Sequence, residues 1–178
     1  MIEHDDDGGR VVPFVRRWHV IHDIDLARLI ADHARLRDVC DRLEACADAL
    51  PDGVSDADAD AVSRRLRAVV VSHPRDETAV IDAPFAADLD DPLTATLVGR
   101  IRARHLSNAV EAEDILAALA GASTPCAEAF GHMLRGFFDG CRRAMEFTEL
   151  AILTLGAQRL TPDARALLVG GLCGRAAA

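Results

Sequence analysis

The sequence contains no lysine and no tyrosine, and only 4% of its residues are aromatic. All 20 basic residues are arginines, and they stand against 29 acidic residues, which gives a formal net charge of −9. A chain with this excess of negative charge has no basic stripe that could neutralise nucleic-acid phosphates or anionic lipid headgroups. We therefore expect it to bind neither nucleic acid nor a membrane.

The chain also lacks an apolar run long enough to span a bilayer. Its first ten residues are polar and acidic, whereas a signal peptide has a basic start followed by an apolar stretch. These features predict a cytoplasmic protein. The five cysteines fit no zinc-finger spacing, so we expect reduced thiols that serve as small, buried apolar side chains.

No phosphate-binding loop, nucleotide fingerprint or nucleophile–base arrangement is recognisable. The glycine pairs at 8–9 and 170–171 lack the neighbouring residues that such loops need. The sequence therefore predicts neither a hydrolase nor a transferase, and we do not expect an enzyme.

What the sequence does contain is apolar residues repeated at steps of three and four, a pattern typical of amphipathic helices. Short connections between long helices favour antiparallel neighbours. We therefore predict an all-α, up-down-up-down four-helix bundle with a short extra C-terminal helix across one end. The five expected helices run from about Asp23 to Leu50, Asp58 to Asp82, Pro92 to Leu119, Cys126 to Arg159 and Pro162 to Leu172.

The bundle is expected to span residues 23–174, with a tail at 175–178. Residues 1–22 should form a partly disordered N-terminal arm that Trp18 anchors across the bundle end. Pro74 falls inside the second expected helix, where its missing N–H and its ring should kink the backbone.

Three of the expected helices carry a histidine in their inward-facing seam, near the middle of the helix. These are His33, His73 and His105, and Glu77 follows His73 by one turn. The middles of bundled helices lie at one level, so we expect the four side chains to converge. His73 and Glu77 share a helix face and can bind one ion. Imidazole with carboxylate favours iron, zinc or manganese over calcium.

A histidine on an apolar face is more often a hydrogen-bonded core residue than a metal ligand. Three histidines and a glutamate on three helices are harder to explain in that way, because an unpaired buried carboxylate is costly. Arginines in nearby turns could still supply the donors. A metal centre and a metal-free polar core are thus both open interpretations of the same residues.

These motifs resemble those of the hemerythrin-like, or HHE cation-binding, family. Asp32–Cys40 resembles the D-H-x-x-x-R stretch of that family's first helix, and His73–Glu77 resembles the H-x-x-D-E of its second. Arg104–His105 resembles a pair in the third helix, and Leu160–Pro162 is similar to the L-T-P ending. The resemblance covers about Asp23 to Gly174.

The resemblance implies a bundle around a non-haem di-iron centre that binds oxygen or nitric oxide, or that stores or senses iron. The family's fourth helix supplies a further H-x-x-x-E, but Ala144 and Thr148 occupy those positions here. We therefore expect an incomplete site. His33, His73 and Glu77 would form a two-His-one-carboxylate set for one iron ion, or for zinc or manganese, with His105 as a fourth ligand.

Other residues of the fourth helix lie near this level. Glu146 and Glu149 are expected to point off the register of the missing ligands, because one residue turns a helix by about 100°. A local π-bulge could turn Glu149 inward, but nothing in the sequence predicts one. Whether Glu146, Glu149 or Cys141 replaces a missing ligand stays open. Cys141 is expected to be a packing thiol rather than a ligand, and His132 to be structural or exposed.

Two main functions fit these expectations. The first is a metal-binding protein that senses or binds oxygen, nitric oxide or iron. The second is a metal-free structural or interaction module that has lost an ancestral site and contacts a protein partner or a second copy of itself. A redox enzyme that uses a single iron is a third hypothesis.

Overall fold

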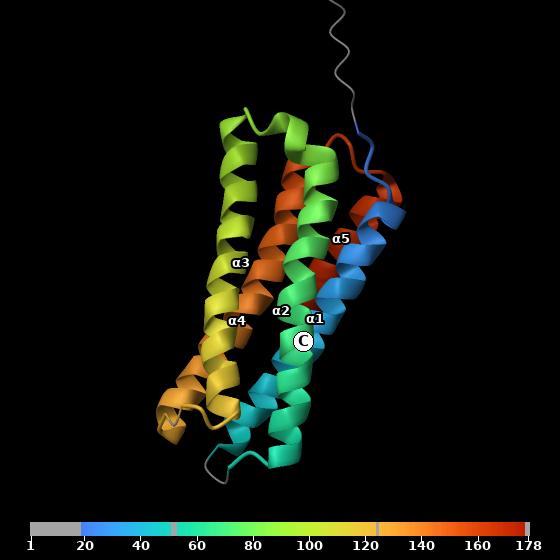
Figure 1. Cartoon of the computed structure of the whole chain (residues 1–178). Coiled ribbons are helices and arrows are strands. Elements are labelled where there is room, and N and C mark those ends of the chain that lie inside the picture. Colours follow the sequence, from blue (N-terminus) through green and yellow to red (C-terminus); the bar gives the residue numbers. More distant parts are fainter. Residues whose placement is uncertain (1–18, 51–52, 124, 177–178) are drawn as a thin grey trace, which may run out of the picture.

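The structure, a computed structural model, describes residues 19–50, 53–123 and 125–176. This part of the chain is helical and contains no β-strand (Figure 1). The all-α prediction is confirmed. The elements are α1 (Asp23–Ala49), α2 (Asp56–Phe85), the 3₁₀ turn η1 (Ala86–Asp88), α3 (Pro92–Leu119), α4 (Ala127–Leu155) and α5 (Pro162–Ala176).

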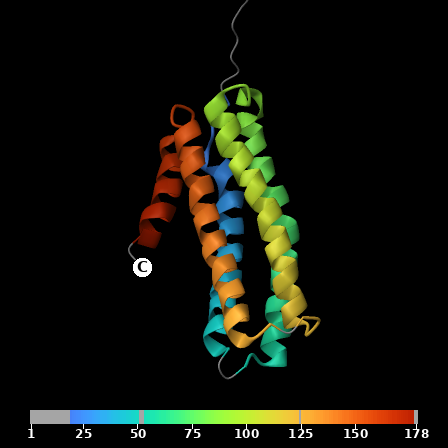
Figure 2. The same ribbon diagram turned by 90° about the vertical axis from the view of Figure 1, so that its left-hand side faces the viewer.

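The four long helices enclose one interior. Helix α1 packs against α2 and α4, and α3 packs against the same two helices, so that the contacts close into a ring. Figures 1 and 2 show the long helices side by side along a common direction. None of the described helices is long and apolar enough to cross a membrane.

Helix α5 lies elsewhere than expected. It contacts α1 and α4, and Figure 2 shows it running back along the outside of α4 instead of lying across the bundle end. The reason is a stripe formed by Ala164 and Leu168, both fully buried in a cluster with Ile21, Leu26 and Ile152. One turn separates the two residues, so both fit the groove between α1 and α4.

Several helix ends differ from the expected bounds. Helix α2 starts at Asp56 because the Ser55 hydroxyl accepts a hydrogen bond from the Asp58 amide, as an N-cap does. The same helix continues through Pro74 and Pro84 to Phe85. Helix α4 ends at Leu155, four residues early. Gly156 follows, where a Cβ would lie 2.7 Å from the Ile152 carbonyl oxygen.

The start of α1 is tied to the segment before α5. Ile21 donates its amide to the Arg159 carbonyl and accepts the Thr161 amide, at 2.9 and 3.0 Å. The buried Ile21 side chain joins the core beside α5. His22 caps α1 in a capping box with Asp25. Trp18, the expected anchor, lies outside the described residues.

A layer of polar side chains divides the core into two apolar clusters. One cluster fills the half of the bundle that holds Leu43, Leu66 and Phe137, and the other fills the half that holds Leu29, Phe85 and α5. Every long helix passes from one cluster to the other through the polar layer. This layer is the candidate functional site.

Candidate metal centre

The polar layer is built from four helices. Its buried members are Asp32 and His33 of α1, His73 and Glu77 of α2, and Thr148 and Glu149 of α4. His105 of α3 lies at its edge, with a side chain 10% exposed. Charged groups are rarely buried unless they are paired or bind a metal. The hydrogen-bond partners of each buried charged group therefore indicate whether the layer can bind a metal.

Three of the four expected ligands come together. His33, His73 and Glu77 each offer a ligand atom, and these atoms all lie within 4.8 Å of one another. All three residues are buried. His105 approaches the same group from α3, with its Nε2 2.5 Å from Glu77 Oε2. The inward seams of three helices thus bring these four side chains to one level.

The two buried histidines are held by their Nδ1 atoms. His33 donates Nδ1–H to Glu149 Oε1 at 2.8 Å, and His73 donates Nδ1–H to Asp32 Oδ2 at 2.5 Å. A carboxylate on Nδ1 fixes the tautomer and orientation of an imidazole, and leaves Nε2 as the metal-binding atom. In metal sites, a histidine ligand typically donates its other ring N–H to a carboxylate in this way.

An arginine backs each of these carboxylates. Arg37 donates to Glu149 Oε1 at 3.1 Å, and Arg35 donates to Asp32 Oδ1 at 2.9 Å. The layer therefore holds two parallel chains of arginine, carboxylate and imidazole. Because all the links are charged or charge-assisted, both imidazoles are fixed more firmly than single neutral hydrogen bonds would fix them.

Glu77 lies between the imidazoles. His33 Nε2 is 3.1 Å from its Oε1, and His73 Nε2 is 3.9 Å from its Oε2. Burial alone would raise the pKa of Glu77, but hydrogen bonds from His105 and His33 outweigh burial and hold this pKa well below its usual range. Glu77 is therefore an ionised carboxylate, the form that binds a metal.

His33 and Asp32 also have shifted pKa values. Burial alone would lower the pKa of His33, but the carboxylates of Glu149 and Glu77 raise it above the ordinary value. Burial alone would raise the pKa of Asp32, but His73 and Arg35 lower it below the ordinary value. Each ring nitrogen of His33 faces a carboxylate oxygen, Nδ1 that of Glu149 and Nε2 that of Glu77, so both positions favour a proton. A metal would replace the proton on Nε2.

Glu149 corrects one sequence-based expectation. It was expected to point off the register, yet it is fully buried and bonded to His33, and α4 is regular α-helix over Ala127–Leu155. No π-bulge is involved. Thr148 and Glu149 lie on either side of the inward direction, so both reach the layer. Glu146 is exposed.

The other histidines that the structure describes, and Cys141, lie outside the centre. His19 and His132 are exposed, and His22 caps α1. Cys141 is buried beside Cys40 in the apolar cluster that holds Leu43 and Phe137, and the Cys40 thiol together with burial raises the pKa of Cys141. All five cysteines are free, but Cys126 and Cys173 are exposed, contrary to the expectation of burial.

No protein-family model, no curated protein and no solved structure matches the chain. The geometry of the polar layer therefore has to indicate the function.

The shifted pKa values predict how stability depends on pH without metal. The lowered pKa values of Asp32 and Glu77 contribute stability that is lost as pH falls below about 4.5. The raised pKa of His33 contributes stability that is present below about pH 6.5 and is lost as pH rises through the folded-state value. We expect urea denaturation in chelator to show an unfolding free energy that declines on both sides of this window.

Glu149→Gln tests the predicted loss of stability at alkaline pH. It keeps the size of the side chain and removes one of the two carboxylates that raise the pKa of His33. The alkaline decline should be smaller in this variant than in the wild type. A wild-type free energy of unfolding that stays constant from pH 6 to 9 would contradict the assignment.

Proposed function

We propose that this chain is a hemerythrin-like, up-down-up-down four-helix bundle that binds a single transition-metal ion, iron in the first instance, in its polar layer. One observation carries the proposal. His33 and His73 direct Nε2 toward the ionised Glu77, while buried carboxylates hold their Nδ1–H groups. A donor set prepared in this way fits a divalent metal.

The residues that would hold the ion are His33, His73 and Glu77, with His105 as a fourth ligand. Two imidazoles and one carboxylate are the donor set of non-haem iron(II), and zinc and manganese fit the same atoms. When bound, iron with this donor set supplies open positions for a small diatomic ligand such as oxygen or nitric oxide. Sensing or binding such a ligand, or iron itself, is the function we propose.

A single ion fits better than two. Ala144 and Thr148 of α4 present no imidazole or carboxylate to the layer. Glu149 has its Oε1 engaged by both His33 and Arg37. Among the described residues, a second ion would therefore lack the α4 ligands of a di-iron site.

A metal-free core is the second candidate. Glu77 is bonded to His33 and His105, and His33 is bonded to two carboxylates, so these charges are compensated within the protein itself. In that case the bundle would be a structural or interaction protein, and its function would lie in contacts with a protein partner or a second copy of the chain.

Metal content separates the two candidates. We expect full-length protein without a metal-binding tag, supplied anaerobically with Fe(II), to retain about one metal ion per chain by elemental analysis. His73→Ala should lose the metal because it removes a ligand. His132→Ala, an exposed histidine on α4, should retain it. Two irons per chain would contradict the single-ion site, and a metal-free wild type would favour the second candidate.

The carboxylate behind His73 gives a more selective test. Asp32→Asn leaves all the ligands in place but weakens the hold on His73 Nδ1–H. We expect the affinity for Zn²⁺ to fall by about ten- to a hundredfold. Asp38→Asn is the matched control, because Asp38 lies on the same helix, is exposed and is bonded to Arg42. Equal affinities in a competition titration of the two variants would argue against Asp32 as a support of the metal ligand.

A further inference from the structure

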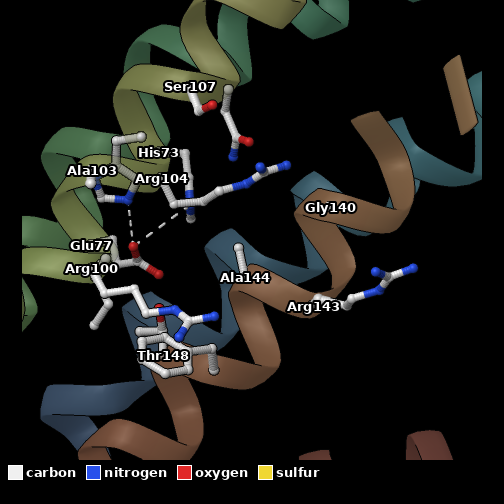
Figure 3. Close-up of a pocket in the computed structure, with 14 residues that line it drawn as sticks. His73, Glu77, Arg100, Ala103, Arg104, Ser107, Gly140, Arg143, Ala144 and Thr148 are labelled. Carbon is white, nitrogen blue, oxygen red and sulfur yellow. Dashed lines mark hydrogen bonds and ion pairs between the residues drawn. The ribbon is translucent and has the colours of Figure 1, made fainter. Parts of the chain in front are cut away.

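A cavity of about 420 Å³ lies between α3 and α4, beside the polar layer. Its lining includes His73, Glu77 and His105 of the layer. Figure 3 shows Glu77 and His73 on one side of it and Ala144 and Thr148 of α4 on the other. Sites for small molecules commonly have volumes of roughly 300–1,000 Å³, so the cavity is large enough for a compact organic molecule.

Small residues of α4 create the space. Gly140, Ala144 and Thr148 follow one another at steps of one helical turn along the lining. Two of them, Ala144 and Thr148, are the positions where the resemblance led us to expect ligands. The absence of larger side chains there leaves the polar layer accessible from the α3–α4 side.

The charge of the lining is opposite to that of the protein. Arg100, Arg104 and Arg143 line the cavity, whereas Glu77 is the one carboxylate of the lining and is engaged by histidines. Two carboxylates outside the lining pair with these arginines: Glu111 Oε1 lies 3.5 Å from Arg104 Nη1, and Asp139 Oδ2 lies 3.7 Å from Arg143 Nη2. The chain as a whole has a net charge of −9. The surface that faces the cavity thus presents more guanidinium groups than carboxylates, which favours an anionic ligand.

Two of these arginines are placed to act together. Arg100 and Arg104 are one turn apart on α3, and Figure 3 shows both reaching toward α4. The Arg100 guanidinium stacks on Phe147, 4.8 Å from the ring centroid. Arg104 rests against Gly140, where an added Cβ would lie 1.9 Å from its Nη2. Arg143 points away from α3 in the same view and lies at the rim.

Asn108 adds a second, independent feature. It lies one turn after Arg104, is only 8% exposed and lines the same cavity. Its Oδ1 has no hydrogen-bond partner among the described residues, and neither has Arg104 Nε. A buried acceptor of this kind is normally satisfied, so a ligand with a hydroxyl group would complete it.

We propose that this cavity binds a small hydroxy acid. Arg100 and Arg104 would hold its carboxylate, because the guanidinium fork matches the geometry of an oxyanion, and Asn108 Oδ1 would accept its hydroxyl. The bound acid would lie against His73 and His105 at the edge of the polar layer. None of these three binding residues is a proposed metal ligand, so this site does not depend on a metal.

The test uses full-length, metal-free protein and three probes. Malate carries carboxylates and a hydroxyl, succinate lacks the hydroxyl, and inorganic phosphate is an oxyanion without a carbon skeleton. We expect malate to shift the backbone amide resonances of residues 100–108 and 140–148 in NMR titrations. Succinate should bind about two- to tenfold more weakly than malate, the value of one neutral hydrogen bond. Phosphate should bind more weakly than malate.

Two glycines of α4 provide a matched pair of variants. Gly140→Ala keeps every charge and favours the helix, but its Cβ would displace the Arg104 guanidinium. Gly136→Ala makes the same change one turn earlier, where nothing lies within 4 Å of the added Cβ. We expect Gly140→Ala to weaken malate binding about tenfold or more, and Gly136→Ala to leave it unchanged. Arg104→Gln should behave like Gly140→Ala, and Arg67→Gln, an exposed arginine of α2, like the wild type.

The proposal is overturned if malate shifts none of the resonances along the lining, or if it binds Gly140→Ala and Arg104→Gln as tightly as the wild type. Phosphate binding as tight as malate binding would overturn the hydroxy-acid assignment. Because metal is absent throughout, failure here leaves the metal proposal untouched, and failure of the metal proposal leaves this one untouched.

Discussion

The pairing of two buried imidazoles with two buried carboxylates is the interaction on which the rest of the centre depends. Glu149 binds His33 across α4 and α1, and Asp32 binds His73 across α1 and α2. An arginine also donates to each carboxylate, Arg37 to Glu149 and Arg35 to Asp32, and a hydrogen bond to a charged group is worth about 1.5–3 kcal/mol. The two pairs therefore fix how α1, α2 and α4 are rotated about their axes, and through this they fix where both Nε2 atoms point.

The apolar clusters on either side of the polar layer stabilise the fold and so offset the cost of burying charged groups between them. A bundle with this much buried apolar surface does not need charged groups in its middle, and replacing buried ion pairs by apolar residues is often neutral or stabilising. The layer extends through all four long helices and borders a cavity lined by arginines. Its position next to that cavity is an argument for the ligand-binding roles that we propose.

Much of the fold was predictable from apolar spacing, and the limits of that prediction have physical causes. Helix α3 has the expected bounds because Asp91 and Pro92 mark its start clearly. The end of α4 was placed too late, because the close approach of Gly156 to Ile152 is a tertiary feature. The position of α5 likewise depends on a groove that forms only once α1 and α4 have packed.

The same holds for the site. The sequence predicted that His33, His73 and Glu77 lie together. The prediction rested on the i, i+4 spacing of His73 and Glu77 and on the position of His33 among the inward-facing residues of its helix. Glu149 was missed because counting in steps of three and four assigns only one line of residues on α4 to the interior. A long side chain next to that line, such as Glu149, still extends into the polar layer. The cavity was missed because the small residues of α4 appeared only as missing ligands, although their small size is what creates the space.

Buried carboxylates hold Nδ1–H of His33 and His73, and this leaves Nε2 of each ring for the metal that we propose. Nitrogen-15 NMR of the histidine side chains during a Zn²⁺ titration tests it most directly. We expect about one Zn²⁺ per chain to move both Nε2 resonances to metal-bound positions while both Nδ1–H protons remain. Imidazole resonances that do not change with zinc, or zinc bound at Nδ1, would contradict it.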